Sequence, residues 1–311
     1  MRQHYYWRLC CIAAGTLLLA AGRARGADDI EVIRVQPNFY MIAGAGGNIA
    51  VQIGPDGVLL VDTGAARMSD RVMAEIRKLT SQPIRFIIDT SADADDVGGN
   101  EKLAKAVGAD GAAAVIIATE NVLTRMSAPT GKQAAFPLAA WPTETFFQKQ
   151  KPMYFNREGI QIMSHAAHSD GDSVVFFRRS DVIVAGGIYD TTRFPVIDVE
   201  KGGGIQQEID ALNQIVELAI PSIPMMWQEG GTQVIPGRGW LADQADVVEY
   251  RDMVTIIRDV VADMMGKGMT LEQIQAANPT RGYRKQYGSE SGSWTTSMFV
   301  EAIYKSLTAK K

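Results

Sequence analysis

Strand-rich and helical stretches alternate along the chain in two similar halves, and this alternation limits the possible folds more than any other feature. Apolar runs bounded by turn residues predict strands, and apolar residues at helical spacing predict helices. The predicted strands are 30–35, 39–43, 48–53, 58–61, 84–88, 113–118, 160–163, 173–177, 182–185 and 232–235. The predicted helices are 69–79, 101–107, 205–219, 247–265, 270–277 and 297–307. Such a pattern is typical of a layered α/β sandwich, here with a helical tail.

Two segments between these elements carry their own predictions. Residues 89–100 are expected to form a loop, because they are rich in Asp and end in Gly-Gly-Asn. Residues 127–152 are rich in Pro, Gly and Thr, and we expect a long connection lying over one mouth of the fold.

The first 26 residues have the features of a signal peptide. Arg2 and Arg8 precede the apolar run Leu9–Gly22, and Ala24-Arg25-Gly26 places small residues at a cleavage site before Ala27. An uncleaved anchor is the alternative, although the run is short for a membrane span. Both cysteines of the chain lie in this segment, so the mature chain would have no disulfide and no cysteine nucleophile. We expect an exported protein, periplasmic or secreted, with no membrane association after cleavage.

The charge of the remaining chain argues against nucleic-acid binding. The full chain has 31 basic and 35 acidic side chains, and the first 26 residues hold four arginines and no acid. The expected mature chain therefore carries 27 basic against 35 acidic groups. Such an acidic protein is repelled by nucleic acids and by anionic lipids.

The acidic loop 89–100 is the clearest candidate for a functional segment. Asp93, Asp95 and Asp96 place three carboxylates within four positions after a buried strand. Like charges at this density are unfavourable unless a cation, an arginine or backbone N–H groups lie close by. Considered alone, the loop could equally be a solvated acidic turn.

Order and spacing of five segments resemble the metallo-β-lactamase fold superfamily, from about residue 30 to residue 245. Within the acidic loop, the match covers Thr90, Asp95, Gly98, Gly99 and Asn100. The other segments are the strand ending in Asp62-Thr63-Gly64, the run His168–Asp172, the strand ending in Ala185-Gly186-Gly187, and 234–239. Phe194–Asp198 and Gly202–Gly204 are also similar to a periplasmic subgroup that has a C-terminal helical extension. The resemblance implies a four-layer αββα sandwich over 27–245, followed by a helical extension over 246–311.

The resemblance fails at most of the family's metal ligands. Family members hold two zinc ions with five histidines and two aspartates, and the metals generate a hydroxide nucleophile. Only Asp95 and His168 match those ligands. The remaining five positions hold Ser91, Asp93, Asp96, Gly187 and Arg238. We therefore expect no metal and no other cofactor, and we exclude β-lactam hydrolysis by the zinc route.

Arg238 is the most informative of these departures. A guanidinium can bind a carboxylate through two parallel hydrogen bonds, so Arg238 could replace the charge of the second metal beside the acidic loop. The alternative is an exposed arginine at a loop end. A single Ca²⁺, Mg²⁺ or Mn²⁺ bound by Asp93, Asp95, Asp96 and His168 also remains open, although Arg238 would repel it.

Two functional hypotheses follow from this pattern. The first is a non-catalytic or catalytically altered protein, a pseudoenzyme, that binds a small-molecule ligand or a periplasmic protein in a pocket at Ser91, Asp93, Asp96, Gly187 and Arg238. The second is a hydrolase of an ester, lactone, thioester or phosphoester, in which Asp95 and His168 act as catalytic groups in a rebuilt mononuclear or metal-free site. Five aromatic residues could line the pocket or pack in the core: Trp141, Phe146, Phe147, Trp227 and Trp240.

Overall fold

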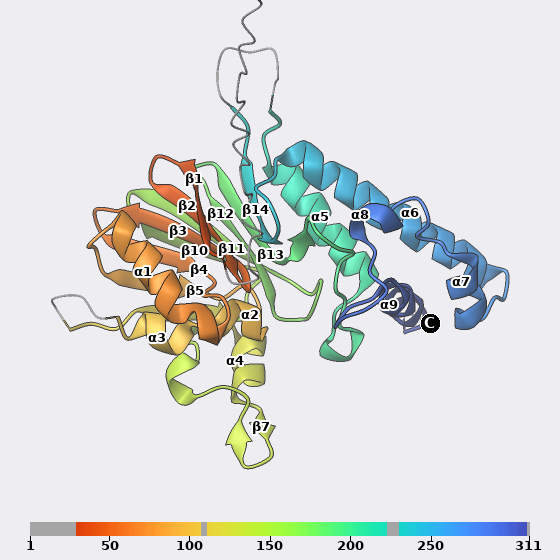
Figure 1. Cartoon of the computed structure of the whole chain (residues 1–311), viewed down its shortest axis with the longest axis horizontal. Coiled ribbons are helices and arrows are strands. Elements are labelled where there is room, and N and C mark those ends of the chain that lie inside the picture. The colour runs from red at the N-terminus through yellow and green to blue at the C-terminus, as the bar shows by residue number, and fades with distance from the viewer. Residues whose placement is uncertain (1–28, 107–110, 223–229, 310–311) are drawn as a thin grey trace, which may run out of the picture.

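Two β-sheets lie face to face at the centre of the molecule (Figure 1). The structure is a computed structural model that describes residues 29–106, 111–222 and 230–309. Within these residues, the larger sheet has the order β1-β2-β3-β4-β5-β6-β9 and the smaller one β10-β11-β12-β13-β14. The larger sheet contains β1 Glu31–Gln36, β2 Phe39–Ala45, β3 Gly47–Gly54, β4 Gly57–Val61, β5 Ile84–Ile88, β6 Val115–Thr119 and β9 Glu144–Phe146. The smaller sheet contains β10 Gln150–Phe155, β11 Glu158–His165, β12 Asp172–Phe177, β13 Val182–Asp190 and β14 Gln233–Arg238.

Apolar residues from both sheets fill the space between them. Phe39 and Phe177 meet edge to face there, with ring centroids 4.7 Å apart. Strands β4, β5 and β6 pair in parallel, and their apolar runs are buried on both faces because helices cover the outer side of the sheet. This arrangement brings the carboxyl ends of several strands to one edge of the sandwich.

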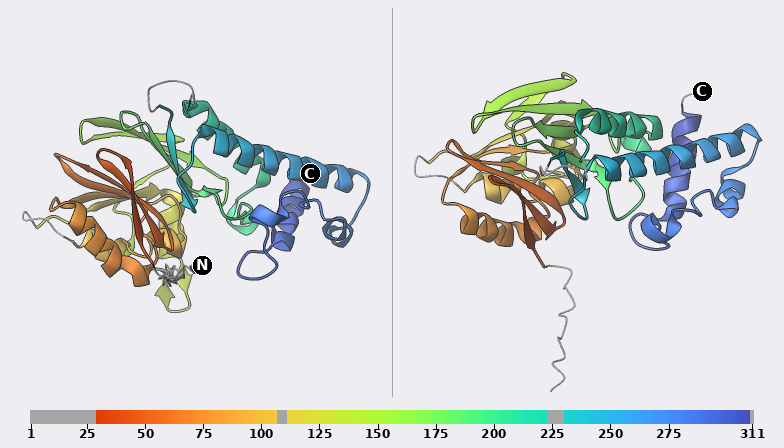
Figure 2. Two further views of the ribbon diagram at one scale, coloured as in Figure 1. Left: turned by 45° about the horizontal axis from the view of Figure 1, so that its top comes forward. Right: turned by 90° about the horizontal axis from the view of Figure 1, so that it is seen from above.

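Helices cover the outer face of each sheet, which confirms the predicted four-layer αββα sandwich (Figure 2). Helices α1 (Ser69–Leu79) and α3 (Asn100–Ala104) pack on the larger sheet. Helices α5 (Ile205–Leu218) and α6 (Gln244–Gly266) pack on the smaller sheet. The predicted helix over 69–79 and the predicted strand over 84–88 have the observed bounds.

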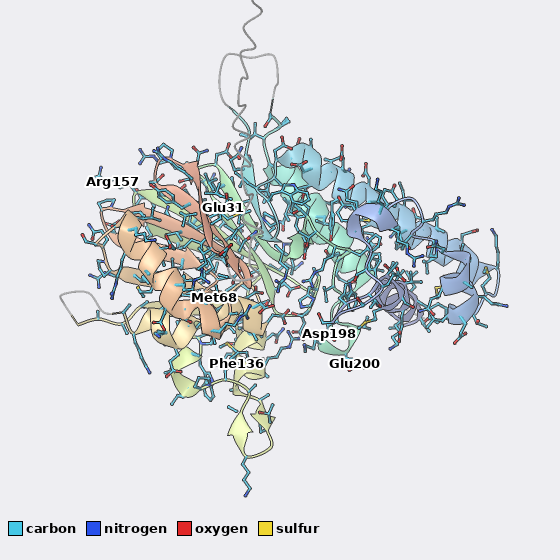
Figure 3. The ribbon with its side chains drawn as sticks, in the orientation of Figure 1. Glu31, Met68, Phe136, Arg157, Asp198 and Glu200 are labelled. Carbon is cyan, nitrogen blue, oxygen red and sulfur yellow. The ribbon has the colours of Figure 1, made fainter. Side chains whose placement is uncertain are left out.

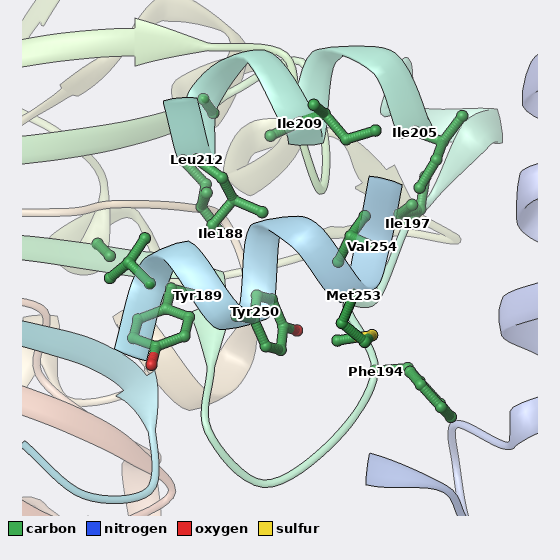
Figure 4. Packing of buried hydrophobic residues seen from close by; sticks show 14 of the residues in the cluster. Ile188, Tyr189, Phe194, Ile197, Ile205, Ile209, Leu212, Tyr250, Met253 and Val254 are labelled. Carbon is green, nitrogen blue, oxygen red and sulfur yellow. The ribbon is translucent and has the colours of Figure 1, made fainter. Parts of the chain in front are cut away.

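The C-terminal helices continue the hydrophobic core of the sandwich. They are α6, α7 (Leu271–Ala277), α8 (Arg284–Tyr287) and α9 (Thr296–Thr308). One cluster joins β13 and α5 to α6 and α9, and Figure 4 shows Tyr189, Phe194 and Tyr250 within it. Phe194 stacks on Phe299 of α9 with ring centroids 4.8 Å apart. The predicted boundary at 245 falls in the first turn of α6, so this core continues across it.

The prediction that residues 127–152 form one long connection is wrong, because strands interrupt it. Helix α4 (Glu120–Ser127) ends at the first residue of this segment. The segment then forms the hairpin of β7 (Pro129–Thr130) and β8 (Gln133–Ala134), the strand β9 and the first half of β10. Strand β9 pairs in parallel with β6, and β10 pairs antiparallel with β11. Both lie at sheet edges, where Pro152 of β10 is tolerated and where short strands give only a weak pattern.

The predicted loop over 89–100 also contains helical structure. Helix α2 spans Ala94–Val97, and α3 begins at Asn100. The expected signal peptide and Trp227 lie outside the described residues. Within 29–106, 111–222 and 230–309, no helix is long and apolar enough to span a membrane.

Candidate functional site

The residues predicted to form the site meet at one edge of the sandwich. Ser91 and Asp93 follow β5, and Asp95 and Asp96 lie on α2. His168 follows β11, Gly187 lies in β13, and Arg238 ends β14. A pocket of about 280 Å³ opens at this edge, and its lining includes Asp93, Asp95, Asp96, His168, Gly187 and Arg238. The structure therefore brings these residues together, with Ser91 buried beneath the pocket.

Arg238 crosses the opening between the two sheets. Its Nη2 donates to Oδ2 of Asp95, and its Nη1 donates to the carbonyl oxygen of Gly46. The side chains of Arg238 and Asp95 are 31% and 44% exposed, so this ion pair is partly solvated. The guanidinium thus holds α2 against the turn between β2 and β3, and Arg238 is not a free arginine at a loop end.

His168 is fixed by contacts at both ring nitrogens. Nε2 lies 3.1 Å from Oδ2 of Asp93, and Nδ1 lies 2.8 Å from the carbonyl oxygen of Val196. Burial alone would lower the pKa of His168, but the hydrogen bond to Asp93 and the charges of Asp172 and Asp93 raise it to about 10. The ring is therefore an imidazolium at neutral pH and donates both N–H groups.

Asp93 and Asp96 have opposite pKa shifts although they are three residues apart. Burial favours the neutral form of Asp93, but its hydrogen bond to His168 and the charge of His168 lower the pKa. Burial, followed by the charge of Asp93, raises the pKa of Asp96 to about 6. Ser91 Oγ lies 2.6 Å from Asp96 Oδ2 and donates to it. Because the serine hydroxyl is buried and engaged in this bond, it supports the loop and does not face a ligand.

Buried polar residues beneath the loop hold it in place. Asp62, in a left-handed backbone conformation with φ 63°, accepts hydrogen bonds from Thr90 N at 2.8 Å and Thr90 Oγ1 at 2.7 Å. Thr63 Oγ1 donates to Asn100 Oδ1, and Asn100 Nδ2 donates to Asp89 Oδ2. Asp62, Thr63, Thr90 and Asn100, which match the family pattern, thus support the loop that carries the site.

Two adjacent glycines of β13 have different roles at the site. Gly186 has φ 53°, and a Cβ there would lie 2.4 Å from Thr90 Oγ1, so only glycine fits. At Gly187 a Cβ would meet only His168, with its nearest atom at 3.8 Å. The backbone therefore leaves room for a side chain at the position where the resemblance places a metal-bridging aspartate.

The donor set does not fit the two zinc ions of the family. Among the described residues, no three His, Cys, Asp or Glu side chains are arranged to hold a metal ion. Both nitrogens of His168 are engaged as donors, and the Arg238 guanidinium binds Asp95. We therefore derive no step through a metal at this site.

The pocket also includes residues that the sequence did not single out. Arg193 and Lys201 come from the segment between β13 and α5, and Trp294 comes from the segment between α8 and α9. Arg193 Nε donates to Oδ2 of Asp190 at 2.7 Å. Trp294 could not be found by the resemblance, because it lies beyond residue 245. Among the five predicted aromatic residues, Phe146 is buried in the core, Phe147 is 78% exposed, and Trp240 is 55% exposed beside the site strand β14.

Several solved structures have a similar fold. No protein-family model matches the chain, and no curated protein matches it by sequence. A double mutant of the sec-alkyl sulfatase PisA1 has 13% identity and a TM-score of 0.66, covering 89% of this chain and 50% of its own. The stereoselective inverting sec-alkylsulfatase Pisa1 from Pseudomonas sp. has 14% identity and a TM-score of 0.60, with the same coverage. A metallo-β-lactamase from Pontibacter korlensis has 14% identity and a TM-score of 0.55, covering 73% of this chain and 99% of its own.

These likenesses show that the chain has the metallo-β-lactamase fold, which confirms the predicted resemblance at the level of the fold. The chain spans about half the length of the alkylsulfatase chains. The likeness shows the fold alone, and among the described residues of this chain no group of three His, Cys, Asp or Glu side chains could hold a metal ion.

The ion pair of His168 predicts a pH dependence of stability. Its pKa is raised in the folded state, so its contribution is complete below the ordinary value of 6.5 and is lost as pH rises through about 10. We expect the free energy of unfolding to fall from pH 7 to pH 10. His168→Gln should flatten this decline, which urea unfolding at several pH values would measure. An equal decline in both proteins would show that the pair does not control it.

Proposed function

We propose that this protein is a non-catalytic binding protein that holds a small polar ligand in the pocket between the 89–100 loop and the C-terminal helices. In this proposal Arg238 takes the place of metal charge, and the protein acts after export, in the periplasm or outside the cell. A periplasmic partner protein is the second kind of ligand that the same pocket could hold, and nucleic acid is not expected.

The observation that carries this proposal is that both catalytic candidates, Asp95 and His168, already make hydrogen bonds to other groups of the protein. His168 contacts Asp93 and Val196 through its two ring nitrogens, and Asp95 is held by Arg238. Asp95 and His168 are therefore not a hydrogen-bonded pair, as an acid–base mechanism through both would favour. The raised pKa of His168 supports the same conclusion, because an imidazolium cannot accept a proton.

The size and composition of the pocket support a ligand rather than an empty remnant. Its volume of about 280 Å³ is close to the lower limit for small-molecule sites. Arg193 and Lys201 line the pocket from the segment between β13 and α5, and Trp294 lines it from the helical extension. These charged and aromatic groups lie outside the positions of the family's metal ligands, so they can contact a ligand without a metal.

A binding screen and a turnover screen separate this proposal from a hydrolase. The chain from Ala27 should show an increased melting temperature with at least one member of a library of small zwitterionic, anionic and neutral polar compounds. Arg193→Gln should reduce that increase, because Arg193 lines the pocket. Surface Arg284→Gln is the matched control, since Arg284 pairs with Glu290 and neither residue lines the pocket.

The same samples should not hydrolyse ester, lactone, thioester or phosphoester substrates. Hydrolysis by the wild-type protein that is lost in His168→Gln would overturn the proposal and favour the hydrolase alternative. Activity that depends on one added divalent ion and on Asp95 would favour the mononuclear site instead.

A further inference from the structure

A second, more apolar pocket adjoins the ligand pocket beside the C-terminal helices. Val196, Asp198 and Trp294 line both pockets, so the two share a boundary. The second pocket has a volume of about 300 Å³ and is lined further by Ile197, Met298 and Ala302. Together the two pockets form one elongated site, which we call the two-chamber site.

Charged groups differ between the two chambers. Three carboxylates line the second chamber, those of Asp198, Glu200 and Glu301, but only one amine, that of Lys305. Lys305 Nζ lies 2.7 Å from Glu301 Oε1. Figure 3 labels Asp198 and Glu200 on the segment before α5. Lys201 Nζ lies 2.8 Å from Asp198 Oδ2 and partly neutralises the charge of this carboxylate. Two of the three carboxylates are thus paired with lysines, and an excess of one negative charge remains, which favours a cation over an anion there.

The first chamber offers donors for an anion. Arg193 uses Nε for Asp190, and its two Nη groups have no hydrogen bond to any described residue. A guanidinium with free donors binds a carboxylate or a phosphate well. However, five aspartates and four basic side chains line the chamber, so its charges nearly balance and it suits a ligand head that carries both signs of charge better than one with only negative charge.

We propose that the two-chamber site binds one amphiphilic molecule with a zwitterionic head, whose alkyl chain occupies the second chamber. The cationic part of the head lies next to the chain, at Trp294, where the indole face and the nearby carboxylates both favour it. The anionic part extends into the first chamber toward Arg193. This inference rests on the proposed function, because it assigns a ligand class to the same pocket.

The order of charges in the head gives a sharp test by calorimetry. N-octyl-N,N-dimethylglycine has its ammonium next to the chain, whereas octylphosphocholine has the reverse order and the same net charge. We expect the first compound to bind at least tenfold more tightly than the second, below the concentrations at which either forms micelles. Hexyl and heptyl analogues of the first should weaken by about fourfold per methylene removed.

Two variants test the two parts of the site separately. Trp294→Leu keeps an apolar residue but removes the aromatic face, so binding of N-octyl-N,N-dimethylglycine should weaken by about fivefold. Binding of octyl glucoside, which has no charge, should change little. Met298→Asp, at a 40% exposed position, should abolish the dependence on chain length. Ile256→Asp, exposed on α6 and outside both chambers, is the matched control.

The possible failures are distinguishable. Binding of trimethylglycine, which has no chain, without any gain from added methylenes would overturn the second chamber and leave the proposed function intact. Equal binding of the two octyl zwitterions, or tighter binding of octyl sulfate, would overturn the assigned head group. If no amphiphile binds, this inference is overturned, and the library screen alone then decides the proposed function.

Discussion

Phe194→Ala is expected to lower the free energy of unfolding by about 4 kcal/mol, the usual cost of removing a fully buried aromatic ring. Phe194 is 1% exposed and stacks on Phe299 with an angle of 7° between the rings. Its backbone N–H also donates to the carbonyl oxygen of Tyr287 at 3.1 Å. The substitution therefore loosens the helical extension from the sandwich.

Ligand binding should be lost together with stability in this variant. Phe194 lies between Arg193 and Val196, both of which line the pocket, and the extension supplies Trp294. Urea unfolding measures the first effect, and the thermal shift with a bound compound measures the second. The control is Phe147→Ala at a 78% exposed position, which should change stability by less than about 0.5 kcal/mol. A similar small loss for Phe194→Ala would mean that the extension does not depend on this contact.

Arg238→Ala should lower the free energy of unfolding by about 2 kcal/mol, because it removes two charge-assisted hydrogen bonds at a partly exposed site. The expected change in melting temperature is about 3 °C for a chain of this size. The loss is smaller than for a fully buried pair, since water reaches both Arg238 and Asp95 and can solvate the remaining carboxylate.

A double-mutant cycle shows whether this loss comes from the pair with Asp95. Asp95→Ala should make the further change of Arg238→Ala markedly less harmful, because the partner is already absent. Arg284→Ala removes a more exposed ion pair with Glu290 and serves as a control with an effect near zero. An unchanged melting temperature for Arg238→Ala would contradict the idea that this arginine stabilises the loop. Chelators should leave the wild-type melting temperature unaffected.

The periodicity of apolar residues predicted most of the fold. Helix α1 could be placed because Val72 and Ile76 lie on one buried face. Strand β5 could be placed because four of its five residues are apolar, with Arg85 as the exception. Strands β9 and β10 were missed for a physical reason. They are edge strands with mixed polar and apolar residues, and their pairing with β6 and β11 depends on contacts distant in sequence.

For the site, the sequence predicted which residues meet and that Arg238 lies beside the acidic loop, but it did not predict which carboxylate Arg238 binds or that His168 pairs with Asp93. The resemblance placed His168 and Asp95 at metal positions, whereas the structure pairs His168 with Asp93 and Asp95 with Arg238. Such pairing depends on side-chain directions that spacing does not encode. Trp294 and Arg193 were missed because they come from segments without a motif that marks them as pocket residues.

The surroundings of Gly187 bear on which substitutions would restore metal ligands to this chain. The strict requirement for glycine falls on Gly186, whereas a Cβ at position 187 would meet no atom closer than 3.8 Å. A single nucleotide change can convert a glycine codon into an aspartate codon, and an arginine codon into a histidine codon. The main obstacle to regaining ligands at positions 187 and 238 is thus electrostatic and not steric, because the guanidinium must be given up before a cation can enter. Laboratory evolution under zinc selection would be expected to change Arg238 first and Gly187 second.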